Sequence, residues 1–355
     1  MLIAASELRR TVHVICVAAG SNDKEATLVA EQLVEANLRG HDSHGIGMLP
    51  QYIQNVRKGT LRPNQHIKIL SDRGSILSID GQWGYGQTIG TEAMDAGIAK
   101  ARQTGLALVA LRNSHHLGRI GTWAEQCLEA NFVSMHLVNV IGSPPRVAPF
   151  GGSDARFGTN PVCIGVPAGE GEPVVLDMAT SRIAMGKARV AKNKGEQVAD
   201  GCLIDSQGYP TRNPKVVFEP PIGALLPFGE HKGSGLALMC ELLGAALTGG
   251  ITIPPGRDRP SAIINNMLSI IIDPGALGSA SAFRAEVERV KAWVKASPPA
   301  PGTKAVMVAG EPERNIRVRR LAEGIPVDAE TWREIVEAAQ SVGVERSALA
   351  APGAA

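Results

Sequence analysis

The stretch that most constrains the fold is a buried strand followed at once by polar residues and glycines. Residues 106–112 form the near-continuous apolar run Leu-Ala-Leu-Val-Ala-Leu-Arg, and residues 113–121 read Asn-Ser-His-His-Leu-Gly-Arg-Ile-Gly. Such a run is typical of a strand buried on both faces of a sheet. A helix over about 119–130 follows, with Trp123 and Cys127 on its inner side. The stretch therefore predicts a sheet covered by helices, with two histidines at the carboxyl end of a central strand.

His115 and His116 stand where ligands bind in open α/β sheets, at the carboxyl ends of the strands. Gly118 and Gly121 leave room for a ligand to approach the backbone. Either histidine could instead satisfy hydrogen bonds of the loop. The position by itself indicates a candidate site, and the rest of the chain has to support it.

Helices and strands do not alternate regularly along the chain, so a regular doubly wound sheet is not required. A mixed α/β fold (α+β), with a mixed sheet and helical ends, is predicted. Periodicity and turn residues predict helices over 6–19, 23–38, 49–58, 87–104, 182–194, 282–295 and 329–342. They predict strands over 66–70, 75–79, 132–141, 162–166, 174–178, 268–272 and 306–308. A hairpin or turn is predicted over 202–211, a surface loop over 254–260 and a frayed tail after 347.

Charge and cysteine content exclude several classes of protein. The 36 basic and 34 acidic residues leave a net charge of +2, with no basic block that would indicate nucleic-acid binding. The five cysteines are far apart and form no C-x-x-C pair, which favours reduced thiols and the cytoplasm over a disulfide framework or a zinc site. No apolar run reaches the length of about 18 residues needed for a membrane span, and no signal peptide is expected.

Standard nucleotide motifs are missing from the sequence. The stretch Gly84-Tyr-Gly-Gln-Thr-Ile-Gly90 has one residue too many for the Rossmann fingerprint, and no acidic residue follows at the required distance. A Walker A loop, a G-x-S-x-G elbow and an H-E-x-x-H helix are also absent from it. If the chain binds a dinucleotide, it does so outside the Rossmann fold.

Four segments place polar side chains in glycine-containing turns: 41–45, 113–121, 156–161 together with 176–181, and 229–235. If they converge, they supply imidazoles, a carboxylate, cations and free backbone amides. This set suits transfer of a hydride with a proton, because an imidazole exchanges the proton while cations and amides hold carboxylate or phosphate. Asp42 and Ser43 could instead cap the next helix, and Asp177 could be purely structural.

Taken together, the motifs resemble those of the type-2 malate/L-lactate dehydrogenase family, which lacks a Rossmann fold. They occur in family order over about residues 5–343. The matching stretches are Asp42-Ser-His-Gly45, Asn113-Ser-His-His-Leu-Gly118, Phe157-Gly-Thr-Asn-Pro161, Leu176-Asp-Met-Ala-Thr-Ser181, Met185-Gly-Lys187, Pro227-Phe-Gly-Glu-His-Lys-Gly233 and Gly310-Glu-Pro-Glu313. The fuller forms of the two histidine motifs, over 41–48 and 115–121, and Glu230-His-Lys232 are similar to one branch of this family.

The resemblance implies a homodimer with a nicotinamide cofactor, NAD with NADP as the alternative, that interconverts 2-oxo acids and 2-hydroxy acids of the pyruvate, hydroxyphenylpyruvate, malate or lactate type. It implies a helical part over 1–75 that packs with 314–355, and a mixed-sheet cofactor domain over 76–313. No nucleic acid, membrane or metal is expected as a partner. Two alternatives stay open: an NADPH-dependent reductase of a cyclic imine acid or keto-sugar acid, and a metal-dependent hydrolase that uses the histidine cluster.

Site residues follow from the motif matches. His116 matches the histidine taken as acid/base in the family, and His44 the second catalytic candidate, which also contacts the nicotinamide. Substrate contacts are expected from Ser43, Tyr52 and Lys187. Cofactor contacts are expected from His44, Gly118, Arg119, Ile120, Leu176, Asp177, Met178, Ala179, Thr180, His231, Asn265, Gly310, Glu311, Pro312 and Glu313.

Two positions depart from the family pattern. Met48 stands where many members carry an arginine that suits a substrate carboxylate, so another cation has to bind that group or the pocket favours an apolar substrate tail. His231 replaces a more usual tyrosine and alters the edge of the cofactor site. Asp177 favours NADH, because free ribose hydroxyls prefer an acidic partner and a 2′-phosphate a basic one.

Overall fold

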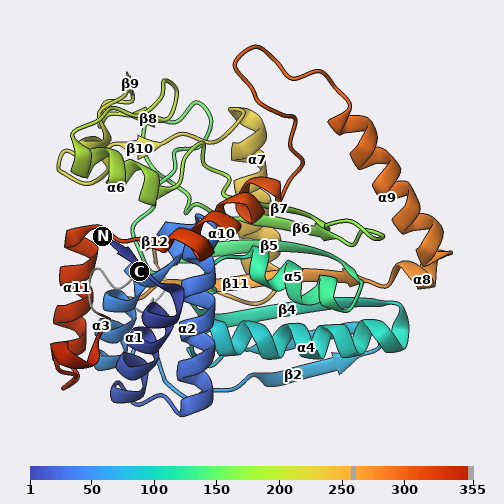
Figure 1. Ribbon diagram of the computed structural model, residues 1–355, viewed down its shortest axis with the longest axis horizontal. Coiled ribbons are helices and arrows are strands. Elements are labelled where there is room, and N and C mark those ends of the chain that lie inside the picture. Colours follow the sequence, from blue (N-terminus) through green and yellow to red (C-terminus); the bar gives the residue numbers. More distant parts are fainter. Residues whose placement is uncertain (257–260, 351–355) are drawn as a thin grey trace.

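The computed structural model describes residues 1–256 and 261–350. Residues 257–260 of the predicted surface loop, and the last residues of the predicted frayed tail and of the 314–355 segment, lie outside the described part. Figure 1 shows a central sheet, a group of helices at the end where both termini lie, a small separate sheet above it, and a long arm that carries α9.

Seven strands form the central sheet in the order β2-β3-β4-β11-β5-β6-β7. Only the pair β3 and β4 is parallel among these neighbours, since helix α4 carries the chain back from the end of β3 to the start of β4. The mixed sheet predicted from the sequence is therefore confirmed. The strands are β2 (Lys68–Arg73), β3 (Ile76–Asp80), β4 (Leu106–His115), β5 (Val133–Ile141), β6 (Val162–Val166), β7 (Val174–Met178) and β11 (Ile264–Ile272).

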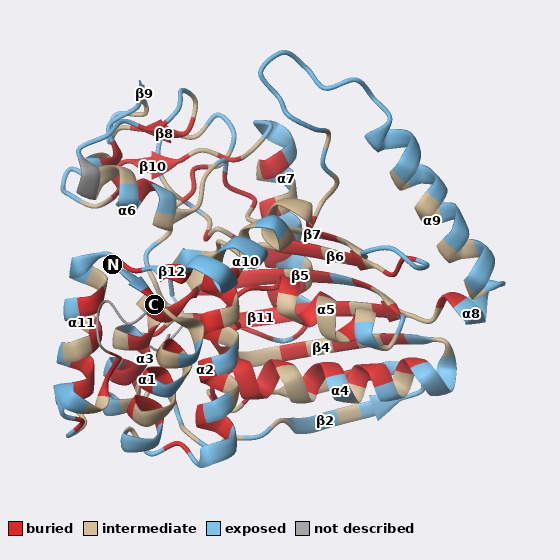
Figure 2. Ribbon diagram, in the orientation of Figure 1, coloured by how far each residue is buried: buried red, intermediate tan, exposed pale blue. Residues whose placement is uncertain are grey.

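Helices α4 (Gly86–Thr104) and α5 (Gly121–Glu129) pack on the sheet and supply its main hydrophobic core. The inner residues predicted for α5 are confirmed, because Trp123 and Cys127 are fully buried. Helix α7 (His231–Met239) continues as the π-helix η4 (Cys240–Ala246), which packs against β5 and β11. Figure 2 shows buried residues along α4 and the neighbouring strands β4 and β11.

Both ends of the chain build a second core. It unites α1 (Ala5–Ala18), α2 (Asp23–Leu38), α3 (Leu49–Arg57) and α11 (Ala329–Gln340), and the short strands β1 (Leu2–Ile3) and β12 (Ile325–Pro326) pair next to it. The 3₁₀ turns η1 (Asp42–His44), η2 (Ile46–Met48) and η5 (Arg346–Ala348) belong to the same end of the molecule. Strand β2 joins the main sheet although it precedes residue 76, and the division into two domains remains a proposal.

A small third unit lies beside these two. Strands β8 (Leu203–Ile204), β9 (Pro210–Thr211) and β10 (Ala224–Leu225) form a sheet of their own, which shares a core with α6 (Met185–Lys194) and the 3₁₀ turn η3 (Pro214–Val217). The hairpin predicted over 202–211 is confirmed as β8 and β9. Helix α6 packs against η1 and so brings this unit to the histidine segment 41–45.

Two predicted features at the C-terminal side are wrong. Residues 306–308 form no strand, because this short apolar run finds no partner among the described strands. Residues 311–313, for which the sequence predicts no helix, are the first residues of helix α10 (Glu311–Glu323), with Gly310 at its N-cap. That helix has no buried residue and therefore no apolar stripe that a sequence could reveal. Helices α8 (Pro274–Leu277) and α9 (Ala280–Lys295) precede it.

Packing of α4 against α5 depends on Gly90. A Cβ added at this position would lie 2.4 Å from the ring of Trp123. We expect Gly90→Ala to lower the free energy of unfolding by about 1–3 kcal/mol, because the indole has no space to move in a close-packed core. Denaturant unfolding measures the change. Gly235→Ala is the control, since nothing lies within 4 Å of its added Cβ. Equal stability of the two variants would contradict the prediction.

Candidate active site

Two histidines from distant parts of the chain face each other. His44 ends the 3₁₀ turn η1, and His116 follows the last residue of β4. Their rings stack with centroids 5.5 Å apart and an interplanar angle of 17°. The structure therefore brings together two of the four segments on which the predicted site depends, and it joins the helical end of the molecule to the sheet.

His116 is held through one ring nitrogen and leaves the other to a ligand. The Tyr52 hydroxyl lies 2.7 Å from Nδ1 of His116, and Gln87 donates from Nε2 to the same hydroxyl over 3.2 Å. Tyr52 is fully buried, which raises the pKa of its phenol. Within the described residues, Nε2 of His116 makes no hydrogen bond to the protein. It is the nitrogen that a substrate can reach.

His115 has a different hydrogen-bond partner and a supporting role. Its Nε2 lies 3.0 Å from Nδ2 of Asn55, and its ring meets Tyr52 edge-on with centroids 5.3 Å apart. The side chain is fully buried. Of the two adjacent histidines, His115 therefore fixes the end of β4 and the Tyr52 ring, while His116 faces His44.

Burial keeps these imidazoles neutral. It lowers the pKa of His44 to about 4, with further lowering by His41. It lowers the pKa of His115 to about 3. The pKa of His116 is held well below its ordinary value by burial first and then by the nearby His44 and His115. A neutral His116 accepts a proton at neutral pH and needs an anionic neighbour to hold one.

The turn that carries His44 is fixed from outside the site. Asn37 donates to Asp42 over 2.6 Å and accepts from the backbone of Ile46, while Arg320 grips both carboxylate oxygens of Asp42 at 2.6 and 3.0 Å. Asp42 therefore anchors the turn. The hydroxyl of Ser43 lies 3.0 Å from Nδ1 of His44 and orients its ring.

Gly118, Arg119 and Ile120 present backbone amides at the start of α5. Gly118 has a φ of +68°, and no protein acceptor within the described residues bonds the backbone N–H groups of these three positions. The side chain of Arg119 is buried and paired with Glu125, and its Nε is enclosed without a partner. Clustered amides at a helix N-terminus beside a cation suit a pyrophosphate. These residues therefore fit a dinucleotide.

Asp177 and Thr180 connect β7 to this cradle. Asp177 accepts from the backbone of Gly121 over 2.8 Å, and one of its oxygens lies 4.0 Å from Arg119. The Thr180 hydroxyl donates to the carbonyl of Thr159 over 3.0 Å. Leu176, Met178 and Ala179 are half-buried on the same segment.

Asn265 and Asn266 support the histidine segment from the neighbouring strand β11. Asn265 accepts from the backbone of Leu117 over 2.8 Å and donates to the carbonyl of Asn139. Asn266 accepts from the backbone of Asn113 over 2.9 Å. Both amides are buried, and each holds one end of the turn around the histidines.

The remaining predicted residues lie around these groups at different depths. Glu313 is 3.7 Å from His41, so Gly310, Glu311, Pro312 and Glu313 approach the His44 turn through α10. His231 is exposed at the start of α7 and meets Phe150, with ring centroids 5.8 Å apart. Lys187 is exposed on α6, next to Gly186, whose added Cβ would lie 2.6 Å from Ser43.

Sequence reasoning missed two polar residues that hold the histidines. Gln87 bonds Tyr52, and Asn55 bonds His115. Gln87 lies inside the glycine-containing stretch that fails the Rossmann fingerprint, and its position just after the start of α4 was the only available signal. No signal in the sequence indicated Asn55, because nothing in the sequence relates α3 to β4.

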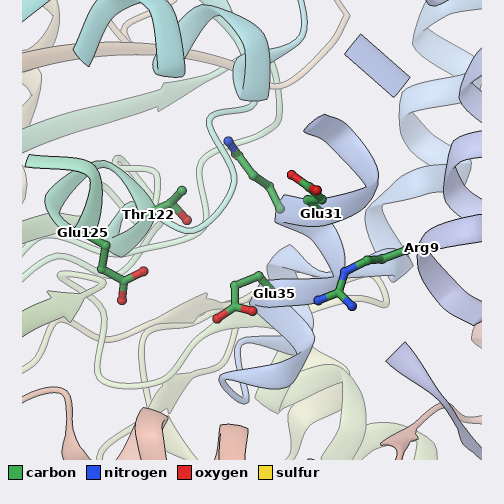
Figure 3. Close-up of a pocket in the computed structure, with 6 residues that line it drawn as sticks. Arg9, Glu31, Glu35, Thr122 and Glu125 are labelled. Carbon is green, nitrogen blue, oxygen red and sulfur yellow. The ribbon is translucent and has the colours of Figure 1, made fainter. Parts of the chain in front are cut away.

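The cavity in Figure 3 lies apart from the histidines. It measures about 310 Å³ and is lined by residues of α1, α2 and α5, namely Arg9, Glu31, Gln32, Glu35, Thr122 and Glu125. Glu35 and Glu125 are both tied to Arg39. Across residues 1–256 and 261–350, no group of three or more His, Cys, Asp or Glu side chains is placed to hold a metal ion.

Two stacked histidines, and a run of backbone amides without a protein acceptor in the described part of the chain, suit a nicotinamide-dependent oxidoreductase without a Rossmann fold. Comparisons with known proteins agree. The profile of the malate/L-lactate dehydrogenase family matches residues 3–336. The chain belongs to this family, is an oxidoreductase, and uses a nicotinamide cofactor as the family does.

Several relatives cover almost the whole chain. Hydroxycarboxylate dehydrogenase B of Escherichia coli O157:H7 is 49% identical over 349 residues, 98% of this chain and 96% of that protein. The L-lactate dehydrogenase of Cupriavidus necator is 40% identical over 317 residues, 89% of this chain and 90% of that protein. A solved malate/lactate dehydrogenase structure from E. coli superposes with a TM-score of 0.93 at 48% identity and covers 98% of this chain and 97% of that one. The resemblance to the family, and to its hydroxycarboxylate dehydrogenase B branch, is confirmed.

Buried neutral histidines make the stability of the protein sensitive to acid. His136 lies between Ser134 and Ser269, away from the site, and burial lowers its pKa from 6.5 to about 3. Between pH 6.5 and about pH 3, the imidazole of His136 is therefore protonated in the unfolded chain and neutral in the folded chain. The contribution of His136 is complete above pH 6.5 and is lost as the pH falls from 6.5 towards 3.

The free energy of unfolding of the parent is expected to fall between pH 7.5 and pH 5, and His136 accounts for about 2 kcal/mol of that fall. We expect His136→Gln to lack this part of the fall, although it is less stable than the parent at pH 7.5. Denaturant unfolding at both pH values measures this difference. The exposed His66 serves as the control position, through His66→Gln. A pH dependence that is the same in parent and His136→Gln would show that His136 is not a neutral buried group.

Proposed function

We propose that the protein interconverts 2-oxo acids and 2-hydroxy acids with NADH or NAD⁺, and that His116 exchanges the proton. The observation that carries this proposal is that the two ring nitrogens of His116 have different surroundings. Nδ1 of His116 is held by Tyr52, while Nε2 faces the site without a protein partner. A ring fixed at one nitrogen and free at the other is suited to general acid/base catalysis.

When bound, the reduced nicotinamide supplies the hydride to C2 of the 2-oxo acid. His116 donates the proton from Nε2 to the alkoxide oxygen that forms there, so an N–H bond breaks and an O–H bond forms. In the reverse direction the neutral imidazole removes the hydroxyl proton. Burial favours the neutral form, and an anionic substrate next to the ring raises the pKa of His116 and stabilises the acid.

His44 has a second role in this proposal. Its ring stacks on that of His116, and the Ser43 hydroxyl holds it through Nδ1. We assign it to contact both the nicotinamide and the substrate. His116 remains the proposed proton donor, because the Tyr52 hydroxyl that holds its ring is fully buried, whereas the Ser43 residue beside His44 is only half-buried.

The substrate carboxylate needs a cation that Met48 cannot provide. Met48 is half-buried against the core of the helical end. Lys187 and Ser43 are the proposed partners, since α6 packs on the turn that carries Ser43. Tyr52 is fully enclosed and acts through His116.

NADH is the proposed cofactor. The carboxylates Asp177 and Glu313 flank the segments assigned to the dinucleotide, and Glu313 lies beside His41. Acidic side chains favour free ribose hydroxyls and repel a 2′-phosphate. Residues 118–120, 176–180 and 310–313, with His231 and Asn265, are assigned to cofactor binding.

Absorbance of reduced nicotinamide tests the function. We expect the parent enzyme to oxidise NADH faster than NADPH with at least one of pyruvate, oxaloacetate, phenylpyruvate or hydroxyphenylpyruvate. His116→Ala is expected to lower kcat by about 10²–10⁴-fold, because it removes the proton donor. His66→Ala, at an exposed histidine, is the control and keeps the parent rate.

Other outcomes separate the alternatives. Turnover only of a cyclic imine acid or keto-sugar acid with NADPH would change substrate and cofactor within the family. Full activity of His116→Ala would overturn the assignment of the proton donor and place it on His44.

A homodimer in the cytoplasm is also proposed. Large apolar side chains are exposed along the arm around α9, where Leu277 is 83% and Trp293 81% exposed. Figure 2 shows most of α9, and the segment that follows it, as exposed. Large apolar side chains left exposed in this way suit a protein interface. The five cysteines are all free and buried, as suits a reducing compartment, and no helix of the described residues is long and apolar enough to cross a membrane.

Solution mass tests the dimer. For the 37.3 kDa chain we expect light scattering to give twice that mass, and Trp293→Ser to shift the equilibrium towards the monomer because it removes an apolar anchor. Tyr209→Ser is the control, as Tyr209 is 66% exposed on the small sheet. A monomeric parent would contradict the dimer, and an unchanged mass of Trp293→Ser would place the interface away from α9.

A further inference from the structure

We propose that Gln87 is a positioning residue that selects which nitrogen of His116 carries the proton. Rotation of the Gln87 side-chain amide reverses the direction of its hydrogen bond with Tyr52. The hydrogen bond between Tyr52 and Nδ1 of His116 then reverses as well. The inference rests on the proposed function, in which Nε2 of His116 exchanges the proton with the substrate.

The hydrogen bonds of the structure define one proton arrangement. Gln87 donates from Nε2 to the Tyr52 oxygen over 3.2 Å, so the single phenol proton of Tyr52 is free to point to Nδ1 of His116, 2.7 Å away. Nδ1 then accepts, and the neutral imidazole carries its proton on Nε2. In this arrangement His116 offers a hydrogen bond to a ligand oxygen and has no lone pair on Nε2 to act as a base.

Proton transfer from Nε2 requires the opposite arrangement. The acid form of His116 has protons on both nitrogens, and the base form that remains after transfer keeps the proton on Nδ1. In both forms Nδ1 donates to the Tyr52 oxygen, and the Tyr52 hydroxyl must donate elsewhere. An acceptor is present, because Oε1 of Gln87 is buried and has no partner among the described residues.

A half-turn of the Gln87 amide brings that acceptor to Tyr52. The oxygen and nitrogen of a primary amide have nearly the same size, so the exchange needs little extra volume. Gly118 lies next to the amide, and its added Cβ would be 3.4 Å from Nε2 of Gln87. A glycine at this position leaves room for the rotation. The rotating amide therefore lies next to a residue that is assigned to the cofactor.

Other groups around His116 cannot take over this role. The titratable groups that face its ring are His44 from η1, His115 from β4 and Tyr52 from α3. His44 stacks on the ring face, and His115 is bonded to Asn55. Tyr52 alone bonds Nδ1 of His116. Apart from His116, Gln87 at the start of α4 is the one residue in the described part of the chain whose side chain bonds Tyr52.

Substitutions that keep the volume of Gln87 test the proposal. Gln87→Met offers Tyr52 neither an amide donor nor an amide oxygen, so the Tyr52 hydroxyl continues to donate to Nδ1 of His116 and the imidazole proton stays on Nε2. We expect kcat to fall by about 10²-fold in both directions with KM nearly unchanged, because the proton-transfer contribution is lost. Gln87→Glu always presents an acceptor oxygen to Tyr52, and we expect it to retain far more activity than Gln87→Met. A residue that only fills space would give the reverse order, since a buried carboxyl is less well tolerated than methionine.

Two controls accompany these variants. Gln51→Leu alters an exposed residue of α3, the helix that carries Tyr52, and is expected to keep the parent kcat. In the Tyr52→Phe background the relay is already broken, so Gln87→Met is expected to cause no further loss. Equal losses from Gln87→Met in the two backgrounds, or a Gln87→Glu enzyme weaker than Gln87→Met, would overturn the proposal.

Nitrogen NMR of protein labelled with ¹⁵N-histidine reads the tautomer without turnover. We expect a proton on Nε2 and none on Nδ1 of His116 in the free parent, and a proton on Nδ1 after addition of NADH and oxamate. Gln87→Met is expected to keep Nδ1 unprotonated in both samples, whereas the free Gln87→Glu protein carries the proton on Nδ1. A free parent with the proton on Nδ1 would contradict the proposal. A parent that reduces no 2-oxo acid, yet shows these tautomers when free, would overturn the proposed function and leave the role of Gln87 intact.

Discussion

The hydrogen bond between Tyr52 and Nδ1 of His116 is the contact on which the site depends, because it joins the two cores of the molecule at the reacting group. Tyr52 belongs to the core built by both chain ends, and His116 follows the central strand β4. The bond is buried, so neither partner can turn to water when it is lost. Position, tautomer and basicity of one imidazole therefore depend on how the helical end is seated on the sheet.

Burial has two effects at this contact. It makes each hydrogen bond to the imidazole strong and directional, and it lowers the pKa of His44 and His116 so that both rings are neutral. Hydrogen bonds, and not permanent charges, therefore fix the positions of the protons on these two imidazoles. Permanent charge lies to one side, at Arg119, where the buried guanidinium is matched by Glu125 and Asp177.

Much of the fold was predictable from local patterns. The apolar run of β4, the glycine that ends α4 and the stripe of α5 were each visible, because a buried element imposes periodicity on its own residues. Helix α10 was not predictable, since ion pairs to Glu35 and Asp42, and not an apolar stripe, hold it in place. Gln87 was likewise invisible, because its importance depends on a tyrosine 35 positions away.

The sequence by itself determined the mixed α/β class, the family and the histidine pair as the chemical centre, since strand periodicity and turn motifs are local properties. Only the tertiary structure decided which of the two adjacent histidines has its ring bonded to Tyr52 and stacked on His44. His115 and His116 are adjacent and chemically identical, and the choice depends on partners from α3: Asn55 binds one ring and Tyr52 the other. The partners of both rings lie about 60 positions away in the sequence, so only the packing of a distant helix gives the two rings different surroundings.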